Sequence, residues 1–544
     1  MSTQTAKEQE LESHIQSMGT TRQEDEARQR ASALSLSYSD GTTLPLDSGA
    51  MKTLPQEACV RAQLIVTFKE GKGIVVATVN PEAPEAKELL GQLKETFSAI
   101  RIFVVSTTTF TSLVAQYPSQ TDAPIATSGV IAIADVSADK ALHAIGDLAG
   151  SLKGLTASDA MARLLTGALA LKGSDIHLEP EASSTRIRIR VDGFLHDAGA
   201  LESSQAGHIV DRIKILSGTK LNITKAPQDG RFTIQQPSLA MEVRVSLLPS
   251  EHGESIVMRL LDPRSITVTL DKQGMPPRVL ETVLKALAQP QGSVIATGPT
   301  GSGKTTTLYA CVQHLNTPDT KIITIEDPIE YHLAGINQTQ TDPEAGYTFA
   351  QGLRSIVRQD PDVILVGEIR DHETAEITMN AALTGHLVLS TIHTNDAAST
   401  VARFKDLGVE ATTLASALTV VLSKRLVRTL CSECKKLSTL APSEHEEISA
   451  QLKGLADLPA ESAWQVYEAV GCSACNNLGY KGRTGVYECL PFSRAVQEAV
   501  SAGSTTLQIQ DIARAEGMES ILQDGYRKVI QGITSLAEVH RVLG

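Results

Sequence analysis

The run GPTGSGKTTT at residues 298–307 decides the fold of much of this chain. It matches G-x-x-x-x-G-K-[ST], the pattern of a loop whose backbone amides bind phosphate. The largely apolar run 293–297 before it predicts a strand, and residues 306–315 after it, without glycine or proline, predict a helix. We expect the loop to bind a nucleoside triphosphate, because a helix N-terminus adds partial positive charge there. The residues of this loop are Gly298, Pro299, Thr300, Gly301, Ser302, Gly303, Lys304, Thr305 and Thr306.

Two side chains of the loop have expected roles of their own. Lys304 is expected to reach the β- and γ-phosphates, and the hydroxyl of Thr305 to bind Mg²⁺. The alternative, a chance glycine turn, is disfavoured because a predicted strand and a predicted helix flank the motif in the required order.

Apolar runs alternate with helical stretches after residue 280, which predicts a parallel sheet covered on both faces. The expected strands are 293–297, 321–325, 363–367 and 387–392. Ligands bind at the carboxyl ends of such strands. Three of these ends are followed by acidic or histidine residues, so the sequence predicts one edge that carries both the phosphate loop and catalytic groups.

Glu368 directly follows the predicted strand 363–367, and Glu326 follows 321–325. A triphosphate with Mg²⁺ needs one carboxylate for the hydrated metal and one to accept a proton from, or to orient, the attacking water. We interpret Glu368 as the catalytic base and Glu326 as the group that positions metal and water. The alternative for either acid is a loop carboxylate that caps the next helix.

Histidines and arginines supply weaker candidates. Either His386 or His393 is a candidate γ-phosphate sensor, although a histidine near a strand end is more often a hydrogen-bonded core residue. Positive charge on the transition state is also needed. The arginine candidates, any of which could instead be a surface residue, are Arg354, Arg358 and Arg370 within the predicted nucleotide domain, and Arg244 and Arg259 in the preceding domain.

The cysteines indicate a metal site. Cys431 and Cys434 form one C-x-x-C pair, and Cys472 and Cys475 form another. Four thiolates suit a closed tetrahedral Zn²⁺ site, which would have a structural role and attach an inserted arm to the domain of the phosphate loop. A redox pair is the alternative, and the remaining cysteines are interpreted as core residues.

Composition limits the function further. The 544 residues predict three or more domains, and the net charge of −13 with only 3% aromatic residues disfavours a nucleic-acid binder. We see no apolar run of about 18 residues that would cross a bilayer, and no signal peptide in the charged N-terminus. A cytoplasmic protein is therefore expected, with any membrane association made through a partner.

The chain is expected to be α/β and multidomain. Residues 1–55 are interpreted as a polar mobile tail, 56–120 as a small α/β domain, and 121–150 as a linker. Residues 151–275 form a middle domain, and 276–544 form the domain of the phosphate loop, with a cysteine arm at about 428–480. In the middle domain the run 185–191 alternates strictly, which places three arginines on one face of a strand.

These motifs together resemble the ATPases of type II secretion and type IV pilus assembly. The resemblance covers residues 150–544 and is carried by GSDIHLEP at 173–180, PQDGR at 227–231, GESIVMRLL at 253–261, the phosphate loop, IEDPIE at 325–330, RQDPD at 358–362 continuing into GEIRD at 367–371, the segments TGH at 384–386 and HTND at 393–396, and the two C-x-x-C pairs. The first 130 residues match only loosely, and Lys424 stands where the family often has glutamine.

The resemblance implies a homo-hexameric ring with a PAS-like middle domain and a RecA-like P-loop motor domain that binds ATP and Mg²⁺. Arg244 and Arg259 would close over the nucleotide, and Arg483 joins Arg354, Arg358 and Arg370 around phosphate and subunit contacts. The motor would act at the inner membrane through a platform protein, without direct nucleic-acid binding. Pilus, pseudopilus and DNA-uptake machines all stay open, as do two rival functions, a RecA-like nucleic-acid motor and a nucleotide-gated scaffold.

Overall fold

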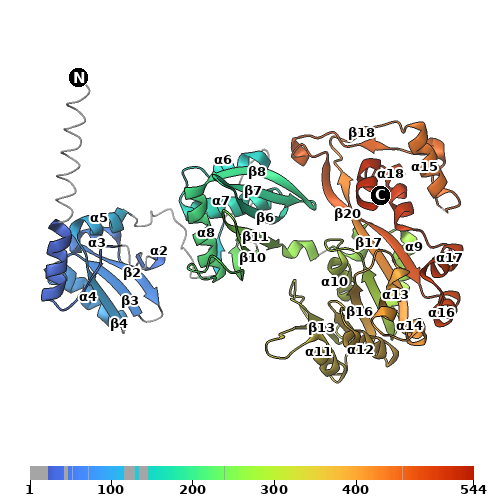
Figure 1. The fold of residues 1–544 in the computed structure, drawn as a ribbon, viewed down its shortest axis with the longest axis horizontal. Helices are drawn as coiled ribbons and strands as arrows, with labels where there is room; N and C mark the ends of the chain where they lie inside the picture. The colour runs from blue at the N-terminus through green and yellow to red at the C-terminus, as the bar shows by residue number, and fades with distance from the viewer. Residues whose placement is uncertain are drawn as a thin grey trace. The chain divides into compact units, whose positions relative to one another are not determined.

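The structure is a computed structural model, and it describes residues 22–41, 44, 47–51, 53–70, 73–97, 99–115, 129–133, 145–237, 239–266, 268–455 and 457–544. Contacts divide the chain into two compact units, residues 1–133 with 234–236, and residues 134–233 with 237–544. All the motifs singled out above belong to the second unit (Figure 1).

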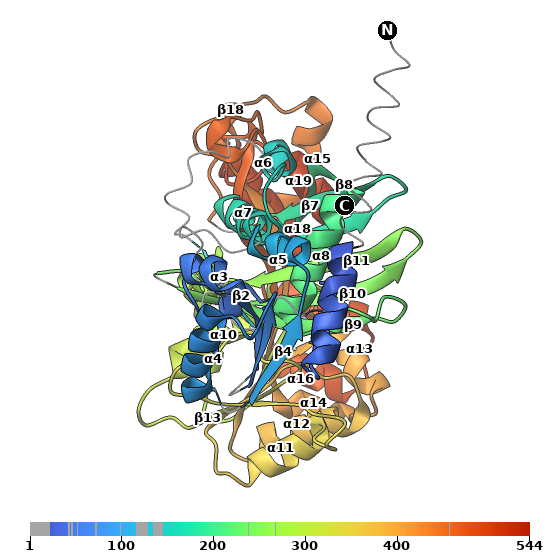
Figure 2. The ribbon, with the colours of Figure 1, turned by 90° about the vertical axis from the view of Figure 1, so that its left-hand side faces the viewer.

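The first unit is a small α/β fold. Its strands lie in the order β1-β4-β3-β2, in which β1, β4 and β3 run parallel and β2 is antiparallel to β3. Figure 2 shows α3, α4 and α5 around this sheet, and its core includes Leu64, Val76 and Phe110. The elements are β1 (Ser37–Tyr38), α2 (Ser48–Met51), α3 (Gln56–Ala62), β2 (Leu64–Glu70), β3 (Gly73–Thr78), α4 (Pro84–Thr96), β4 (Ala99–Val104), α5 (Thr107–Ala115) and β5 (Val130–Ala132).

The segment that we interpreted as a tail differs from that prediction from Arg22 onward. Residues 22–33 are helical and bury Ala27 and Ala31. The carboxylate of Glu24 accepts hydrogen bonds from the hydroxyls of Ser106 (2.6 Å) and Thr109 (2.9 Å) at the start of α5. The polar composition misled the prediction, because two small buried alanines and one partly buried carboxylate are enough to attach this helix. Residues 1–21 lie outside the described part of the chain.

The middle part of the second unit is an antiparallel sheet with helices packed on it. Strands β10, β11, β6, β7 and β8 are neighbours in that order, and α7 and α8 pack on the sheet. The arginines of β7 do share one face, opposite buried Ile187 and Ile189. The elements are α6 (Leu148–Ser151), α7 (Ala157–Ala170), β6 (Gly173–Pro180), β7 (Ser184–Val191), β8 (Phe194–Glu202), α8 (Ser203–Ser217), β9 (Gln228–Gln235), β10 (Ala240–Ser250) and β11 (Gly253–Leu261).

The linker to the motor domain contains a short helical turn, η4 (Leu270–Gln273), which the next element, α9 (Pro277–Leu287), follows closely. Both Leu270 and Gln273 are buried in the motor. This linker is therefore packed into the domain that it precedes.

The motor domain is built on a sheet in the order β14-β13-β15-β16-β12-β17-β20. All neighbours are parallel except β17 and β20. The strands are β12 (Gly292–Thr297), β13 (Ile322–Glu326), β14 (Asn337–Gln340), β15 (Val363–Val366), β16 (Leu387–Ile392), β17 (Leu418–Leu430) and β20 (Tyr480–Pro491). The four predicted strands are thus confirmed to within one residue, and they run parallel as expected.

Two hydrophobic cores cover the two faces of this sheet. One contains Val294 and Leu389 with residues of α9 and α10, and the other contains Ile295 and Val388 with residues of α11, α12 and α14. Because both faces of the sheet are buried, these strands appear in the sequence as continuous apolar runs. The helices are α10 (Lys304–Leu315), α11 (Phe349–Val357), α12 (His372–Leu383), α13 (Ser399–Asp406), α14 (Ala411–Ala417), α16 (Arg494–Ser501), α17 (Thr506–Ala515), α18 (Ile521–Ile530) and α19 (Leu536–Leu543).

The cysteine arm is the connection of a long hairpin. Strands β17 and β20 pair from Val420 opposite Pro491 to Leu430 opposite Tyr480. The arm between them holds β18 (Lys436–Leu437), α15 (Pro442–Leu452) and β19 (Tyr467–Glu468). A separate small core joins α15 to α18 and α19, so the arm is attached to the C-terminal helices. Among the described residues, no helix has both the length and the apolar character that a membrane span requires.

Candidate nucleotide site and cysteine cluster

The phosphate loop connects the end of β12 to the start of α10, as the motif predicts. Gly298, Gly301 and Gly303 all adopt positive φ, a conformation that glycine reaches without strain. Gly303 is the N-cap of α10. The first turn of this helix therefore points its free amides at the position where a phosphate would bind.

Strand β17 lies directly against this loop. A Cβ atom at Gly298 would come within 2.4 Å of the carbonyl oxygen of Lys424. A Cβ atom at Gly303 would come within 3.3 Å of the Nζ atom of the same lysine. Glycine at 298 is thus required by close packing as well as by backbone conformation, glycine at 303 is favoured by its positive φ, and β17 lies directly beneath the loop.

Lys304 is buried at the mouth of the loop. Its Nζ donates hydrogen bonds to the carbonyls of Gly298 (2.9 Å) and Pro299 (3.2 Å). Burial lowers the pKa of Lys304, while the nearby charge of Glu368 opposes that shift. Lys304 and Glu368 line one cleft, at the ends of β12 and β15.

Glu368 follows β15 and is largely buried, with 15% of its side chain exposed. It forms an ion pair with Arg370, and its second oxygen lies 3.6 Å from Nε2 of His393. Burial, followed by the charge of Lys304, lowers the pKa of His393. The catalytic-base role of Glu368 stays a prediction, and this position beside His393 and Arg370 is compatible with it.

Glu326, at the end of β13, is held by its neighbours. Tyr309 donates a hydrogen bond to Oε2 of Glu326, and Oε1 accepts from Thr324 (2.6 Å) and Gln338 (3.2 Å). Both oxygens of the carboxylate are therefore engaged within the chain. A direct part for Glu326 in positioning metal and water stays a prediction, and these contacts favour a role in holding the floor of the site.

The cleft around the loop has a volume of about 520 Å³. Besides the loop, its lining includes Glu326, Glu368, Arg370 and His393 from the sheet edge, together with Arg259 and Arg483. Arg259 donates to Asp175 (3.0 Å). The cleft therefore brings together the predicted base, the phosphate loop, one arginine from β11 of the middle domain and one from β20 at the edge of the motor sheet.

Arg244 is close to this cleft without lining it. Its Nη1 donates to Oε2 of Glu330 (2.9 Å), and Nη2 donates to the carbonyl of Ile329. Glu330 lines the cleft. Arg244 thus contacts the segment after β13, and its expected closure over the nucleotide stays a prediction.

Three candidates lie outside the cleft. Arg354 pairs with Glu373 (2.6 Å), and Arg358 donates to Ser355 (3.4 Å) on the surface. His386 precedes β16, whose first residue pairs with the first residue of β12, so His386 lies at the edge opposite the phosphate loop. Of the two histidines, the structure therefore places only His393 where a phosphate sensor would lie, and His386 bonds the carbonyl of Ala381 (3.0 Å).

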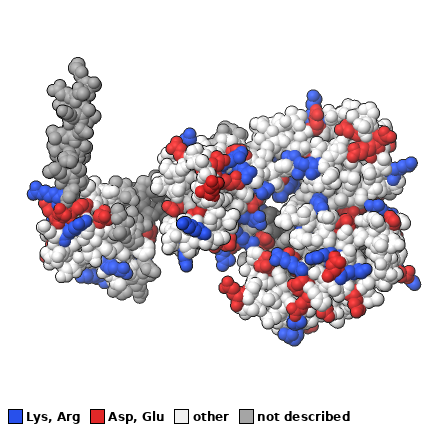
Figure 3. All heavy atoms as spheres, in the orientation of Figure 1, with Lys and Arg blue, Asp and Glu red and all other residues white. Residues whose placement is uncertain are grey.

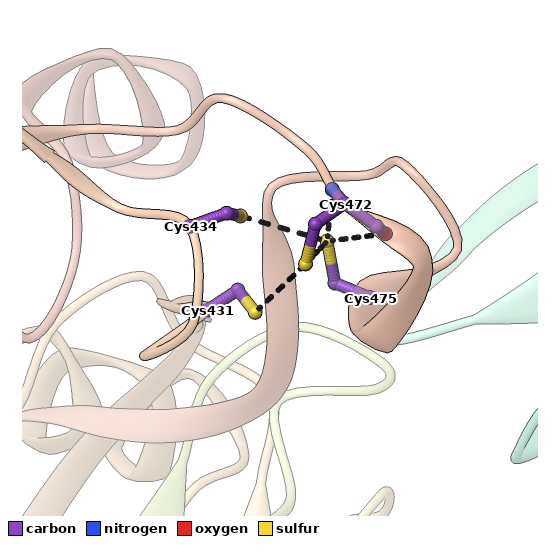
Figure 4. A group of neighbouring side chains, drawn as sticks. All are labelled: Cys431, Cys434, Cys472 and Cys475. Atoms are coloured by element: carbon purple, nitrogen blue, oxygen red, sulfur yellow. Dashed lines mark hydrogen bonds between the residues drawn. The ribbon is translucent and has the colours of Figure 1, made fainter.

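The four arm cysteines converge, as Figure 4 shows. All four sulfurs lie within 4.8 Å of one another. The Sγ atoms of Cys431 and Cys472 are 3.9 Å apart, and those of Cys434 and Cys475 are 3.8 Å apart. These distances are too long for disulfides, whose sulfurs lie about 2.05 Å apart.

A zinc ion fits these residues. A tetrahedron with Zn–S bonds of about 2.3 Å has sulfur–sulfur edges of about 3.8 Å, close to the separations found here. Backbone amides also point at the sulfurs, with Gly471 donating to Cys434 (3.3 Å) and Gly479 to Cys475 (3.2 Å). Such amide donors accompany thiolate ligands because they stabilise the negative sulfur.

Comparison with known proteins assigns the family. Residues 156–541 match the family described as "Type II/IV secretion system protein", which is more than half of the chain. The chain belongs to this family. The resemblance inferred from the motifs is confirmed, and as a member with a complete phosphate loop this chain is a secretion-family ATPase.

Relatives with names agree with that assignment. This secretion-family ATPase is 44% identical over 379 residues to the type II secretion system ATPase E of Vibrio cholerae, which covers 70% of this chain and 74% of that protein. It is 35% identical over 532 residues to the type IV pilus assembly ATPase PilB of Thermus thermophilus, covering 97% of this chain. The matched region is only 58% of the Thermus protein.

Solved structures show the fold. The ATPase DotB of Legionella pneumophila superposes with a TM-score of 0.51 at 22% identity, over 70% of this chain and 94% of DotB. DotB of Yersinia pseudotuberculosis gives 0.52 at 19% identity, over 70% and 92%. The expected multidomain α/β architecture with a P-loop motor domain is thus confirmed for this secretion-family ATPase.

Two polar residues near the loop were not predicted as site residues. Lys424 and Gln273 are buried beneath α10 and hydrogen-bond each other. A lysine that closely follows the largely apolar run 418–422 is a sequence signal for the first. The second gives no such signal, because its partners come from β17 and α10, far away along the chain.

Proposed function

We propose that this secretion-family ATPase hydrolyses ATP to drive the assembly of pilin or pseudopilin subunits in a type IV pilus or type II secretion machine. The observation that supports this most is that Lys304, Glu368 and His393 line one cleft at the carboxyl ends of parallel strands. The names of the relatives extend the proposal to pilus assembly and type II secretion.

Each residue of the cleft has its own role in this proposal. Lys304 and the amides at the start of α10 bind the phosphates, and the hydroxyl of Thr305, which is exposed to the cleft, joins the ligands of Mg²⁺. When bound, the ion neutralises phosphate charge and orients the terminal phosphoryl group. Glu368 accepts a proton from the attacking water, and neutral His393 keeps that carboxylate oriented.

Arginines complete the site by stabilising charge that develops on the transferred phosphoryl group. Arg259 and Arg483 line the cleft in this structure, and Arg370 lies beside the catalytic carboxylate. Arg244 is held at the rim through Glu330. Because Arg244 and Arg259 come from the sheet of the middle domain, the geometry supports a cycle in which hydrolysis changes how that domain contacts the motor.

The assembly around this chain is also part of the proposal. A homo-hexamer would place Arg354 and Arg358, both exposed on or beside α11, at a subunit contact. A platform protein of the inner membrane would receive the motion on the cytoplasmic side. The zinc ion would hold the arm structurally, since a closed set of four cysteines leaves no open position for chemistry.

Two substitutions test the catalytic assignment. Lys304→Ala is expected to abolish binding of ATP, because it removes the cation at the phosphates. Glu368→Gln is expected to keep ATP binding and to slow hydrolysis by about 10²-fold or more, since proton transfer contributes about 10²–10⁴. Phosphate release by the purified full chain and a binding titration with ATP measure the two effects.

The matched control is Glu498→Gln, the same chemical change at an exposed residue of α16, which is expected to leave turnover within about twofold. If Glu368→Gln hydrolyses ATP as fast as the unmodified chain, the proposed base is wrong. If the unmodified chain binds ATP and does not hydrolyse it, the nucleotide-gated scaffold replaces the proposal.

A further inference from the structure

A buried lysine lies directly beneath the phosphate loop. Only 3% of Lys424 is exposed. Its Nζ donates to the hydroxyl of Thr307 (2.8 Å), to Oε1 of Gln273 (2.9 Å) and to the carbonyl of Gly303 (3.4 Å). An ammonium group has three hydrogens, so all its donors are used, and none of these three acceptors is a carboxylate.

The partners of Lys424 belong to the machinery that binds phosphate. Gly303 caps α10, and the backbone amide of Thr307 donates to the carbonyl of Gly303 (3.1 Å) in the first turn of that helix. Lys424 therefore ties the helix start to β17. Its Nζ is held there by the three hydrogen bonds to Thr307, Gln273 and Gly303.

Gln273 connects the same cluster to the linker. Its side-chain amide donates to the carbonyl of Thr306 (3.3 Å), and its oxygen accepts from Thr307 (2.7 Å) as well as from Lys424. Its backbone carbonyl accepts a hydrogen bond from Tyr487 (3.0 Å) in β20. The segment that joins the middle domain to the motor is thus bonded to the first turn of α10.

We propose that Lys424 is a positioning residue for nucleotide binding: from beneath the loop it fixes the first turn of α10 through Thr307, Gly303 and Gln273 and adds positive charge behind the phosphates. The inference rests on the proposed nucleotide site and goes beyond it, because Lys424 does not itself line the cleft and reaches it only through residues such as Gly303. Its effect falls on nucleotide affinity, and the chemical step keeps its rate.

The surroundings of Lys424 let its charge vary near neutral pH. Burial lowers the pKa of Lys424 to about 7, and Cys311 in α10 is one of the titratable groups that face it. The other charged or titratable groups that face it are Arg483 and Tyr487 of β20 and, across the Tyr487 ring, the buried Asp524–Lys528 pair of α18. Burial raises the pKa of Cys311 to about 12, so this thiol stays neutral.

The sign of the pH effect follows from the charges. Lys424 is protonated below about pH 7 and loses its charge as the pH rises. A bound phosphate anion favours the protonated form, so binding raises the lysine pKa and affinity falls as pH increases from about 7. A charge acting over several ångströms in a partly buried site changes affinity by about threefold to tenfold.

The test compares the full chain with Lys424→Gln, Lys424→Arg and Lys424→Met, using a fluorescent ADP derivative with Mg²⁺ from pH 6 to 9. Glutamine keeps a donor and removes the charge, so its dissociation constant at pH 6 is expected to rise about threefold to tenfold. Its pH profile above 7 is expected to be flatter than that of the unmodified chain. Lys424→Arg, which stays charged, is expected to lose the pH dependence while it keeps tighter binding than Lys424→Gln.

Steady-state hydrolysis separates positioning from catalysis. For Lys424→Gln we expect KM for ATP to rise and kcat to stay within about twofold. Identical ADP affinity and identical pH profiles for the unmodified chain and Lys424→Gln overturn the inference, as does a loss confined to kcat. If Lys424→Met fails to fold, Lys424→Gln and Lys424→Arg still decide. Failure of the unmodified chain itself to bind ADP would instead refute the proposed nucleotide site.

Discussion

At the scale of single residues, buried charges around the nucleotide cleft are held by specific donors. Glu326 is 3% exposed and depends on Tyr309, which is fully buried. Burial and the neighbouring charge of Glu326 raise the pKa of Tyr309, so the phenol keeps its proton and remains a donor. The carboxylate in turn accepts further hydrogen bonds from Thr324 and Gln338.

We therefore predict that Tyr309→Phe lowers the free energy of unfolding by about 1.5–3 kcal/mol, the usual contribution of a hydrogen bond to a charged group. Urea unfolding of the full chain measures it. The matched control is Tyr347→Phe, which removes a hydroxyl bonded to neutral Thr339 at 3.2 Å and is expected to cost about 1 kcal/mol or less. Equal losses for both variants would contradict the special role of the buried carboxylate.

Some site residues follow from the sequence and others cannot. Glu368 was predictable because a carboxylate placed directly after a buried parallel strand must lie at the ligand-binding edge. His386 and His393 flank the same strand, β16, at its two ends. The pairing of β16 with β12 shows that His393 lies at the end beside the phosphate loop and His386 at the opposite end. Lys424 and Gln273 gain their roles from contacts between segments about 150 residues apart, which local patterns do not encode.

At the scale of elements, the alternation of strands and helices predicted the parallel sheet, and the hairpin of β17 and β20 went unpredicted. Its two strands pair with each other, and the whole inserted arm lies between them in the sequence. Sequence patterns identify hairpins mainly through short turns, and no short turn joins these strands. The cysteine pairs were recognised because their local spacing is short, although the intervening residues 435–471 are many.

The cysteine cluster gives a prediction at this scale. The purified chain is expected to hold about one zinc ion, and Cys472→Ser is expected to lose it, because three thiolates no longer close the tetrahedron. Elemental analysis measures the metal, and limited proteolysis within 431–479 is expected to speed up. Cys59→Ser, at a buried thiol of the first unit, is the control and should retain zinc. Unmodified protein purified without chelator and found free of zinc would refute the assignment.

At the scale of the whole molecule, the arginines of the middle domain decide whether one chain builds a complete site. Arg259 lines the same cleft as Lys304 and Glu368.

The face drawn in Figure 3 shows acidic and basic side chains interspersed, and the net charge is −13. This distribution suits contacts between protein surfaces better than the uniform positive field that nucleic acid requires.

We predict that Arg259→Ala slows hydrolysis by about 10²-fold or more, because it removes positive charge from the transition state. Mixing Arg259→Ala chains with Glu368→Gln chains tests which chain supplies the arginine. If each chain uses its own Arg259, as the shared cleft indicates, phosphate release by the mixture stays at the level of the separate variants. A clear recovery would show that the arginine acts on the nucleotide of a neighbouring copy.

The control mixture combines Lys304→Ala with Glu368→Gln. Both of these residues come from the motor domain and line one cleft, so this mixture is expected to stay inactive in either case. Recovery in the control would mean that the motor domains themselves share sites, and the cleft described here would then be incomplete in one chain.

The distribution of thiols has a practical consequence. Burial raises the pKa of Cys311 and Cys489 to about 12 and that of Cys59 to about 11. Alkylating reagents attack thiolates, so these three thiols are expected not to react while the chain is folded. Any rapid alkylation of the native protein must then come from the four sulfurs of the arm, and its onset would report the release of the zinc ion that we propose to join them.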